Sequence, residues 1–266
     1  MTVDKDDYGS ILPGLMAGGV GGDDSSLAAF LVSRSNLPGP RANLKLLEAY
    51  STAVGELSRG RAGHLWSLSL RLRESNDEFV AMCGVRGIGA IGSCNPRAYG
   101  KKAISELRSS AIHRDWRVRE AVAMALQDMI ESDPQRVEAL ETWVAGGSWL
   151  EMRAAVAGVA EPKLLRSPAV ASRALRLHRE VFARITSAQM PKPREFGVLR
   201  QALAYTLSVV VAALPVEGFS FMEELVGIRD QDVRWICREN LKKDRLISRF
   251  PDKVRALTAK ARPLNG

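Results

Sequence analysis

Residues 113–129 read HRDWRVREAVAMALQDM, and this stretch decides the fold. It places an aspartate ahead of an apolar residue, an arginine and further apolar residues, in the order Asp115, Val118, Arg119, Val122 and Leu126. Apolar residues three and four positions apart share one face of an α-helix. The stretch therefore predicts an amphipathic helix that starts at Asp115 and runs to about residue 130.

The same pattern returns three times, at residues 149–156 (WLEMRAAV), 199–207 (LRQALAYTL) and 230–237 (DQDVRWIC). With two earlier helix pairs included, the arginine position recurs at intervals of 34 to 47 residues, at Lys45, Ala81, Arg119, Arg153, Arg200 and Arg234. The longest interval contains a proline-containing loop at 189–193. A helical hairpin repeated at such intervals is typical of solenoid proteins, in which neighbouring hairpins stack into one core.

The rest of the chain is also expected to be helical, and no segment alternates convincingly as a strand does. A helix is expected to begin at Asp133-Pro134, and a closing one at Pro251. The other expected helices are 25–33, 41–57, 64–73, 78–91, 96–109, 115–130, 149–159, 168–186, 195–214, 217–228 and 230–249. Residues 1–24 are rich in glycine and aspartate and predict an irregular N-terminal arm ahead of a single domain at 25–266.

This arrangement resembles HEAT repeats, whose second helix typically carries an apolar–arginine pair behind an aspartate. The resemblance covers residues 41–250, although the first two hairpins lack the arginine. It implies an all-α fold, a HEAT-like α-solenoid that forms a right-handed superhelix of about six hairpins. It also implies that the arginines hold neighbouring repeats together through buried hydrogen bonds, which concerns Arg119, Arg153, Arg200 and Arg234.

Composition favours a soluble, cytoplasmic protein. The chain has 266 residues, of which 46% are hydrophobic, enough for a substantial core. Its three cysteines are far apart and predict no disulfide framework. The acidic start is unlike a signal peptide, and the longest apolar run, 209–214, is too short to span a membrane.

Common catalytic motifs are absent from the sequence. Gly87, Gly89 and Gly92 match the dinucleotide motif G-x-G-x-x-G. That motif needs a preceding strand, whereas these glycines fall inside a predicted helix, where close packing of two helices explains them better. The three histidines are isolated from one another and from cysteines, so no metal and no cofactor is expected.

Positive charge is concentrated at the C-terminal end. Residues 227–266 hold eleven Lys and Arg against five Asp and Glu, which accounts for +6 of the net charge of +8. Five cations follow each other at helical spacing and predict a basic stripe on one helix face, suited to phosphates along a duplex. A solvated face is the alternative. The stripe comprises Arg234, Arg238, Lys242, Arg245 and Arg249.

A narrower resemblance is to the HEAT-like-repeat DNA alkylation repair family, the alkylpurine DNA glycosylases. Their site combines Trp-x-x-x-Asp with an arginine and a tryptophan from the next two repeats. The matching residues here are Trp116, Glu120, Arg153 and Tyr205. Glutamate stands for aspartate, tyrosine stands for tryptophan, and one extra residue separates Trp149 from the arginine.

The resemblance implies a role for each of these residues. Glu120 would stabilise the cation that forms as the glycosidic bond breaks. The aromatic rings of Trp116 and Tyr205 would pack on the nucleic acid, and Arg153 would grip a phosphate. Equally, Trp116 and Glu120 could be ordinary repeat residues.

Three functions are therefore open: a non-catalytic nucleic-acid-binding protein, an active base-excision glycosylase, and a protein–protein scaffold. We expect the first, with Trp116, Arg153, Tyr205, Arg238, Lys242, Arg245 and Arg249 in contact with nucleic acid. The expected partners are duplex DNA or a protein on the concave face, without a membrane or a small-molecule cofactor.

Overall fold

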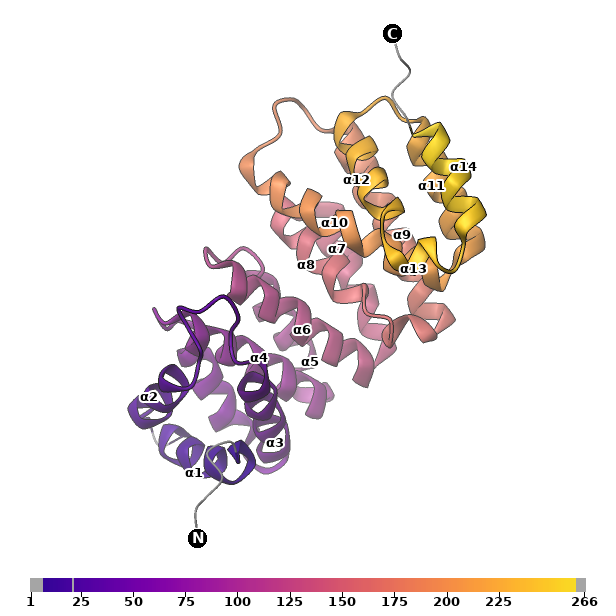
Figure 1. The fold of residues 1–266 in the computed structure, drawn as a ribbon. Coiled ribbons are helices and arrows are strands. Elements are labelled where there is room, and N and C mark those ends of the chain that lie inside the picture. The colour runs from indigo at the N-terminus through magenta and orange to yellow at the C-terminus, as the bar shows by residue number, and fades with distance from the viewer. Residues whose placement is uncertain (1–6, 21, 262–266) are drawn as a thin grey trace. The chain divides into compact units, whose positions relative to one another are not determined.

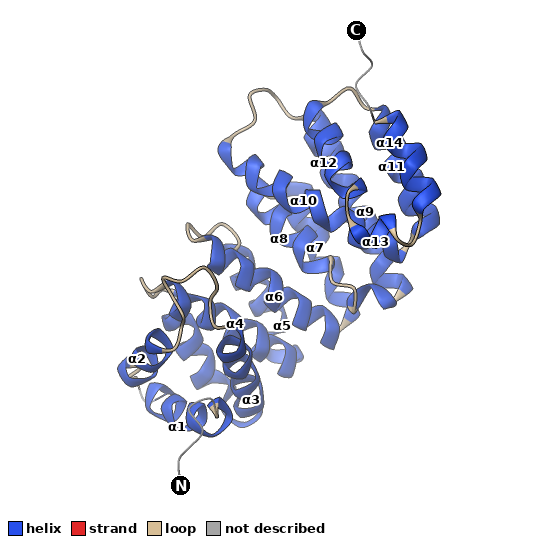
Figure 2. Cartoon of the chain, in the orientation of Figure 1, coloured by secondary structure: helices blue, strands red, loops and turns tan. Residues whose placement is uncertain are grey.

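The computed structural model describes residues 7–20 and 22–261, and all regular structure in these residues is helical (Figures 1 and 2). They form fourteen α-helices and two short 3-10 helices, with no strand in this part of the chain. The all-α class predicted from the sequence is thereby confirmed. Where the sequence predicted one domain at 25–266, the chain divides into two compact units, residues 1–133 and 134–266.

The first unit is built around α4, which packs against α3, α5 and α6 and is buried along most of its length. Asp77 caps it by accepting hydrogen bonds from the N–H groups of Phe79 and Val80, at 2.9 and 3.0 Å. The helices are α1 (Tyr8–Val20), α2 (Ser25–Ser33), α3 (Leu44–Arg73), α4 (Glu78–Cys94), α5 (Pro96–Ser110) and α6 (Trp116–Ser132).

The prediction of an irregular N-terminal arm is wrong for residues 8–20, which form α1. Tyr8, Leu12 and Met16 recur every fourth residue and are buried against the unit, where α1 contacts α2 and α3. The Tyr8 hydroxyl also accepts a hydrogen bond from the Asn43 side chain at 3.1 Å. Burial of this apolar face outweighs the low helix propensity of the surrounding glycines. Residues 1–6 and 21 of the predicted arm lie outside the described residues.

Helix α3 combines two predicted helices, 41–57 and 64–73, into one long element. Its dihedral angles leave the helical region at Arg61 (φ −137°, ψ 33°), so the helix is kinked between the two predicted segments. The prediction of two separate helices is therefore wrong, but the kink lies between the two predicted segments.

The glycines of α4 are packing sites, as the sequence predicted for Gly87, Gly89 and Gly92. A Cβ atom on Gly84 would lie 2.2 Å from the backbone nitrogen of Arg73 in α3, and one on Gly89 would lie 2.7 Å from the Cβ of Ala125 in α6. No side chain fits at such distances, so glycine allows α3 and α6 to approach α4 closely. Because Gly87–Gly92 lie within a helix, they have no geometry for binding a nucleotide.

The second unit has α10 at its centre, in contact with α8, α9, α11 and α12. Its 3-10 helices are η1 (Pro134–Glu138) and η2 (Leu164–Arg166). Its α-helices are α7 (Ala139–Gly146), α8 (Trp149–Val159), α9 (Pro168–Ser187), α10 (Arg194–Ala213), α11 (Pro215–Gly227), α12 (Gln231–Leu241), α13 (Asp244–Ile247) and α14 (Pro251–Lys260).

Helix α10 is the one helix in the described residues that is long and apolar enough to cross a membrane, but 67% of its apolar window is buried inside the protein. Two polar side chains also bond it to its neighbours. His178 of α9 lies 3.0 Å from the Thr206 hydroxyl. Asn240 of α12 accepts from the Ser208 N–H at 2.7 Å and donates to the Leu203 carbonyl at 2.8 Å. These features are those of a core helix.

The prediction of one helix over 230–249 is wrong in its second half. Helix α12 ends at Leu241, Lys243 adopts extended dihedral angles (φ −77°, ψ 129°), and the four-residue α13 follows. Since the chain turns at Lys243, the predicted stripe does not continue along one helix face. Only Arg234 and Arg238 stay within α12, with Lys242 as its C-cap.

Candidate nucleic-acid interface

The turn before α6 is held by hydrogen bonds from the helix that follows it. Arg119 donates to the carbonyl oxygens of His113 and Arg114 at 2.6 and 2.8 Å. The Asp115 N–H donates to His113 Nδ1 at 3.0 Å. As a result, Trp116 begins the helix in a fixed position.

Trp116 is an exposed aromatic side chain, 55% accessible to solvent. The guanidinium of Arg117 lies 4.6 Å from the centre of its ring. Arg117 in turn donates to Glu78 Oε2 at 2.8 Å and to the Gly39 carbonyl at 3.1 Å. The arginine is thus held in place by α4 and by the loop before α3, and it presents a cation beside an exposed ring.

Glu120 follows Trp116 by one helical turn, so the two residues lie on the same side of α6. Glu120 is half-buried and interacts with other groups of the protein. Both residues belong to the first unit. The first unit therefore supplies two residues of the predicted glycosylase site, Trp116 and Glu120, one helical turn apart.

Arg153 and Tyr205 belong to the second unit, on α8 and α10, which pack against each other. Tyr205 is 38% exposed, so its ring is accessible to a ligand. Arg153 is only 9% exposed and already interacts within the protein. Burial of this kind favours a structural role for Arg153 over a grip on phosphate.

Two other arginines of the recurring position, Arg200 and Arg234, also contact groups of the protein. Arg200 lies 2.9 Å from Asp232 and 3.8 Å from the centre of the Trp235 ring, so it joins α10 to α12. Arg234 donates to the Ile228 carbonyl at 3.0 Å and holds the turn before its own helix, as Arg119 does. These contacts join Arg200 to a neighbouring hairpin, whereas those of Arg119 and Arg234 lie within their own hairpins.

Sequence reasoning missed Lys192, which fixes the long loop before α10. Its ammonium group lies 3.2 Å from Asp230 and 2.8 Å from Asp232, and its side chain is only 4% exposed. Burial lowers the pKa of Lys192, but the two carboxylates outweigh it and raise the pKa overall. For Asp230 the directions are reversed. Burial raises its pKa, but hydrogen bonds from Val233 and Lys192 outweigh burial and bring the pKa below its ordinary value.

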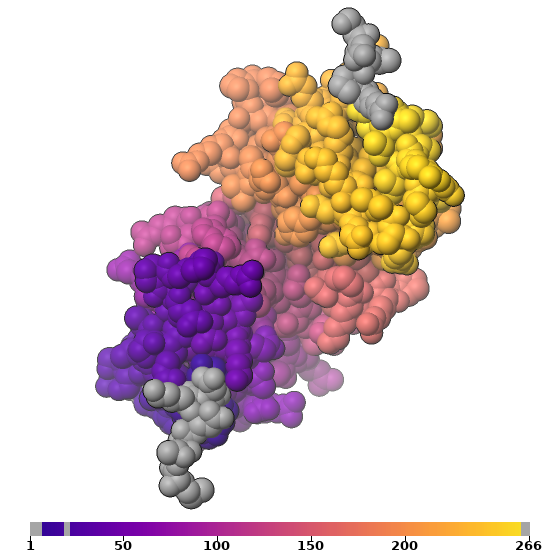
Figure 3. Space-filling view, in the orientation of Figure 1, coloured from indigo at the N-terminus to yellow at the C-terminus, as the bar shows by residue number. Residues whose placement is uncertain are grey.

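The basic group of the C-terminal segment consists of Arg238, Lys242, Arg245 and Arg249, and all four side chains are exposed. The C-terminal segment to which they belong is yellow in Figure 3. Lys242 donates to Glu239 at 2.6 Å, and Arg249 lies 5.2 Å from the centre of the Phe250 ring. Within the described residues, Arg238 and Arg245 form no hydrogen bond or ion pair. Their charges are therefore open to an external anion.

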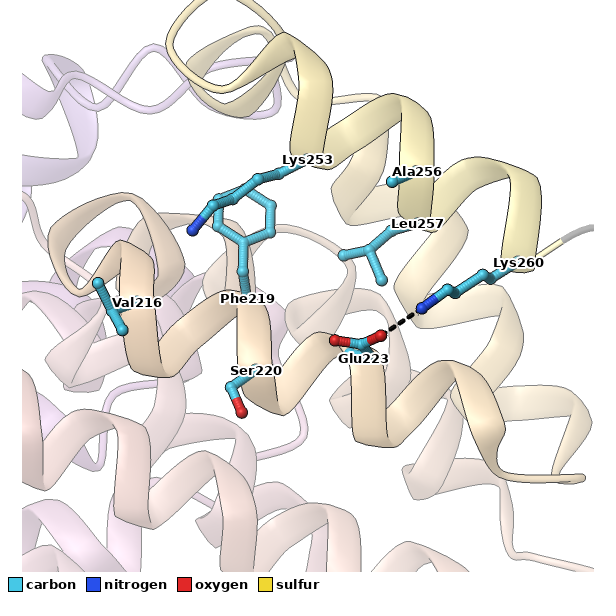
Figure 4. Close-up of a pocket in the computed structure, with 8 residues that line it drawn as sticks. All are labelled: Val216, Phe219, Ser220, Glu223, Lys253, Ala256, Leu257 and Lys260. Carbon is cyan, nitrogen blue, oxygen red and sulfur yellow. Dashed lines mark hydrogen bonds and ion pairs between the residues drawn. The ribbon is translucent and has the colours of Figure 1, made fainter.

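A groove of about 290 Å³ lies between α11 and α14 (Figure 4). Lys260 pairs with Glu223 at its mouth, and the ammonium of Lys253 lies 5.2 Å from the centre of the Phe219 ring. Glu223 thus neutralises Lys260, whereas Lys253 contacts only an aromatic ring.

Among residues 7–20 and 22–261, no group of three or more His, Cys, Asp and Glu side chains is placed to hold a metal ion. The three cysteines, Cys83, Cys94 and Cys237, are free thiols. Burial raises the pKa of Cys83 well above its ordinary value, so this thiol is not a reactive thiolate.

No protein-family model matches the chain, and no curated protein does. Among solved structures, a crystal structure of an engineered protein matches 80% of this chain and 97% of its own length at 16% identity, with a TM-score of 0.30. Another engineered protein matches 85% of this chain and 97% of its own at 15% identity, with a TM-score of 0.32. Likeness at these TM-scores supports no conclusion about fold or function.

Proposed function

We propose that this chain is a non-catalytic, HEAT-like helical-repeat protein of the cytoplasm that binds duplex DNA through its C-terminal basic group. In this proposal the helical hairpins form a right-handed superhelix related to the alkylation-repair glycosylases. The recurring arginine positions and the helix pairs α5–α6, α9–α10 and α11–α12 support the repeat interpretation. Free thiols at all three cysteines agree with a reducing compartment.

The observation that carries the proposal is the exposure of Arg238, Lys242, Arg245 and Arg249 within a short C-terminal stretch. Phosphate groups of DNA attract such cations and release counterions on binding. Contacts of this type position a protein on a duplex without reading its sequence. The buried state of Arg153 weighs against a working glycosylase site, because that family uses this position to hold phosphate.

A salt titration of duplex DNA binding tests the proposal. The variant Lys242→Gln/Arg245→Gln/Arg249→Gln should bind more weakly, with a log–log salt slope shallower by about 0.9 for each lost phosphate contact. The matched control replaces three exposed cations elsewhere, Arg59, Arg97 and Arg166, by glutamine.

Both triple variants lose the same net charge, so only the location of the charges differs. An equal loss of DNA binding in the two variants would refute a specific role for the basic group. Absence of DNA binding by the wild type at low salt would favour the third function, a scaffold for a protein partner.

An active alkylpurine glycosylase is the second candidate, because Trp116 is exposed and Glu120 lies one helical turn away. In that function Glu120 would stabilise the positive charge that develops on the sugar, and Trp116 and Tyr205 would pack against the DNA.

A further inference from the structure

A second groove lies in the C-terminal segment, between α12, α13 and α14, with a volume of about 460 Å³. Leu241 and Val254 line it and are 4% and 8% exposed, whereas Ile247 remains 44% exposed. Thr258 of α14 and Ala261, the residue that caps its C-terminus, complete the lining. A volume of this size is in the range of small-molecule sites, which are mostly apolar with a few polar groups.

The polar groups at this groove are cationic. Arg238 and Lys242 line it, one helical turn apart at the end of α12, and no acidic residue does. Lys242 is bonded to Glu239. The guanidinium of Arg238 has no hydrogen bond or ion pair within the described part of the chain. The groove therefore combines an apolar lining with one unmatched positive charge.

Two other grooves differ from it because acidic side chains line them. The groove between α11 and α14 contains Glu223, which neutralises Lys260. A groove of about 460 Å³ between α1 and α3 is lined by one cation, Lys45, and by the carboxylates of Glu48 and Glu56. Each of these grooves thus has at least one carboxylate in its lining, although in the first one Lys253 contacts the Phe219 ring rather than an acid.

We propose that the groove between α12 and α14 binds a small amphiphilic anion, specifically a medium-chain carboxylate. Its acyl chain would lie along Leu241, Ile247 and Val254, and its carboxylate would meet the guanidinium of Arg238. A guanidinium can donate two parallel hydrogen bonds to one carboxylate. Phosphates of a duplex are charged groups and would not bind to an apolar lining. This inference therefore goes beyond the proposed function and does not depend on it.

Isothermal titration calorimetry with hexanoate, octanoate and decanoate, each below its micellar concentration, tests the proposal. Binding should be saturable with one site per chain, and the affinity should rise by up to about fourfold per added methylene. Nonyltrimethylammonium has the same nine-carbon chain as decanoate with a positive head group and should bind much more weakly. Absence of saturable binding, or equal affinity for the cationic analogue, would overturn the proposal.

Variants locate the site. Thr258→Trp places a bulky ring in the groove from an exposed position and should abolish decanoate binding. Arg238→Gln should weaken binding by about threefold, as expected for one exposed charge pair. Arg255→Gln is the control, because Arg255 is an exposed cation of α14 that pairs with Asp252 and does not line the groove.

Thermal unfolding shows whether each variant folds. If Thr258→Trp does not fold, Ile247→Asn replaces it, because it makes an apolar lining side chain polar and should weaken decanoate binding. Decanoate binding that is unchanged in whichever of these two variants folds would place the ligand elsewhere and refute the assignment. The calorimetric titration contains no DNA, so its result does not depend on whether the protein binds DNA. Failure of decanoate binding would likewise leave the DNA-binding proposal untouched.

Discussion

The Nε2 atom of His178 lies 3.0 Å from the hydroxyl oxygen of Thr206, and its Nδ1 atom lies 2.8 Å from the carbonyl oxygen of Ala174. Because a carbonyl only accepts, Nδ1 must carry the proton, and the neutral ring then accepts from Thr206 through Nε2. The imidazole is fully buried. A second proton on this ring would remove the acceptor and place a charge in the core of the second unit.

The first prediction concerns pH. Burial lowers the pKa of His178 to about 4, whereas an unfolded chain takes up the proton near its ordinary value of about 6.5. The unfolded state therefore binds more protons between these values, and stability falls as pH decreases through this window. The loss should reach about 3 kcal/mol by pH 4. Urea denaturation at several pH values measures it.

The variant His178→Gln serves as the control for this pH effect. It removes the titrating group, so its free energy of unfolding should vary less between pH 6.5 and 4, even if it is lower throughout. An equally steep pH dependence in this variant would show that other groups cause the loss of stability.

The second prediction concerns Arg86, whose buried side chain bonds to Asp128 at 2.5 Å and to Glu48 at 2.6 Å. The carboxylates are 39% and 64% exposed and so reach water, unlike the arginine. Burial raises the pKa of Asp128, and Arg86 offsets part of this rise. Glu48→Gln/Asp128→Asn should cost about 3–5 kcal/mol, since it leaves an uncompensated buried charge. Arg86→Met should cost less, because water can solvate the remaining carboxylates. Chemical denaturation compares them, and the reverse order would contradict the argument.

The third prediction concerns α1. Leu12→Ala should lower the free energy of unfolding by about 2–5 kcal/mol, because Leu12 is fully buried. Gly14→Ala is the control: a Cβ atom there meets nothing within 4 Å, and alanine favours the helix by about 0.5–1 kcal/mol. Denaturation curves that do not distinguish Leu12→Ala from the wild type would mean that α1 contributes little to the first unit in solution.

These elements show how far the sequence predicts the structure. Helices such as α6 follow from the spacing of Val118, Val122 and Leu126, which is a local property. Helix α1 was not predicted because its glycines have a low helix propensity. Burial against α3, which the local sequence does not show, stabilises it. The break at Lys243 contains no proline or glycine, so only the packing of α13 and α14 reveals it.

The candidate sites were harder to predict for a similar reason. Exposure of Arg245 and Arg249 was expected from the sequence and is confirmed. The pairing of Lys192 with Asp232 joins residues that are far apart along the chain, and the sequence alone does not show which carboxylate lies opposite which cation. The groove beside Arg238 depends on the turn at Lys243. The sequence predicted a continuous helix there, and a continuous helix would not form this groove.

The fourth prediction tests catalysis. The proposed function predicts that the wild-type protein releases no alkylated purine from DNA above the spontaneous rate. Chromatographic detection of free base from methylated DNA measures this. Release that is lost in Glu120→Gln but kept in Glu131→Gln, an exposed control on the same helix, would instead establish the glycosylase function.

The amide of Asn240 has a mechanical consequence for the second unit. It bonds to an N–H and a carbonyl of α10, and it also donates to the Ile236 carbonyl of its own helix at 2.8 Å. A hydrogen bond weakens steeply when its distance and angle change, so these bonds resist sliding of one helix along the other. The α10–α12 joint should therefore be stiff, and any elastic bending within this unit should occur at joints that lack such a bond.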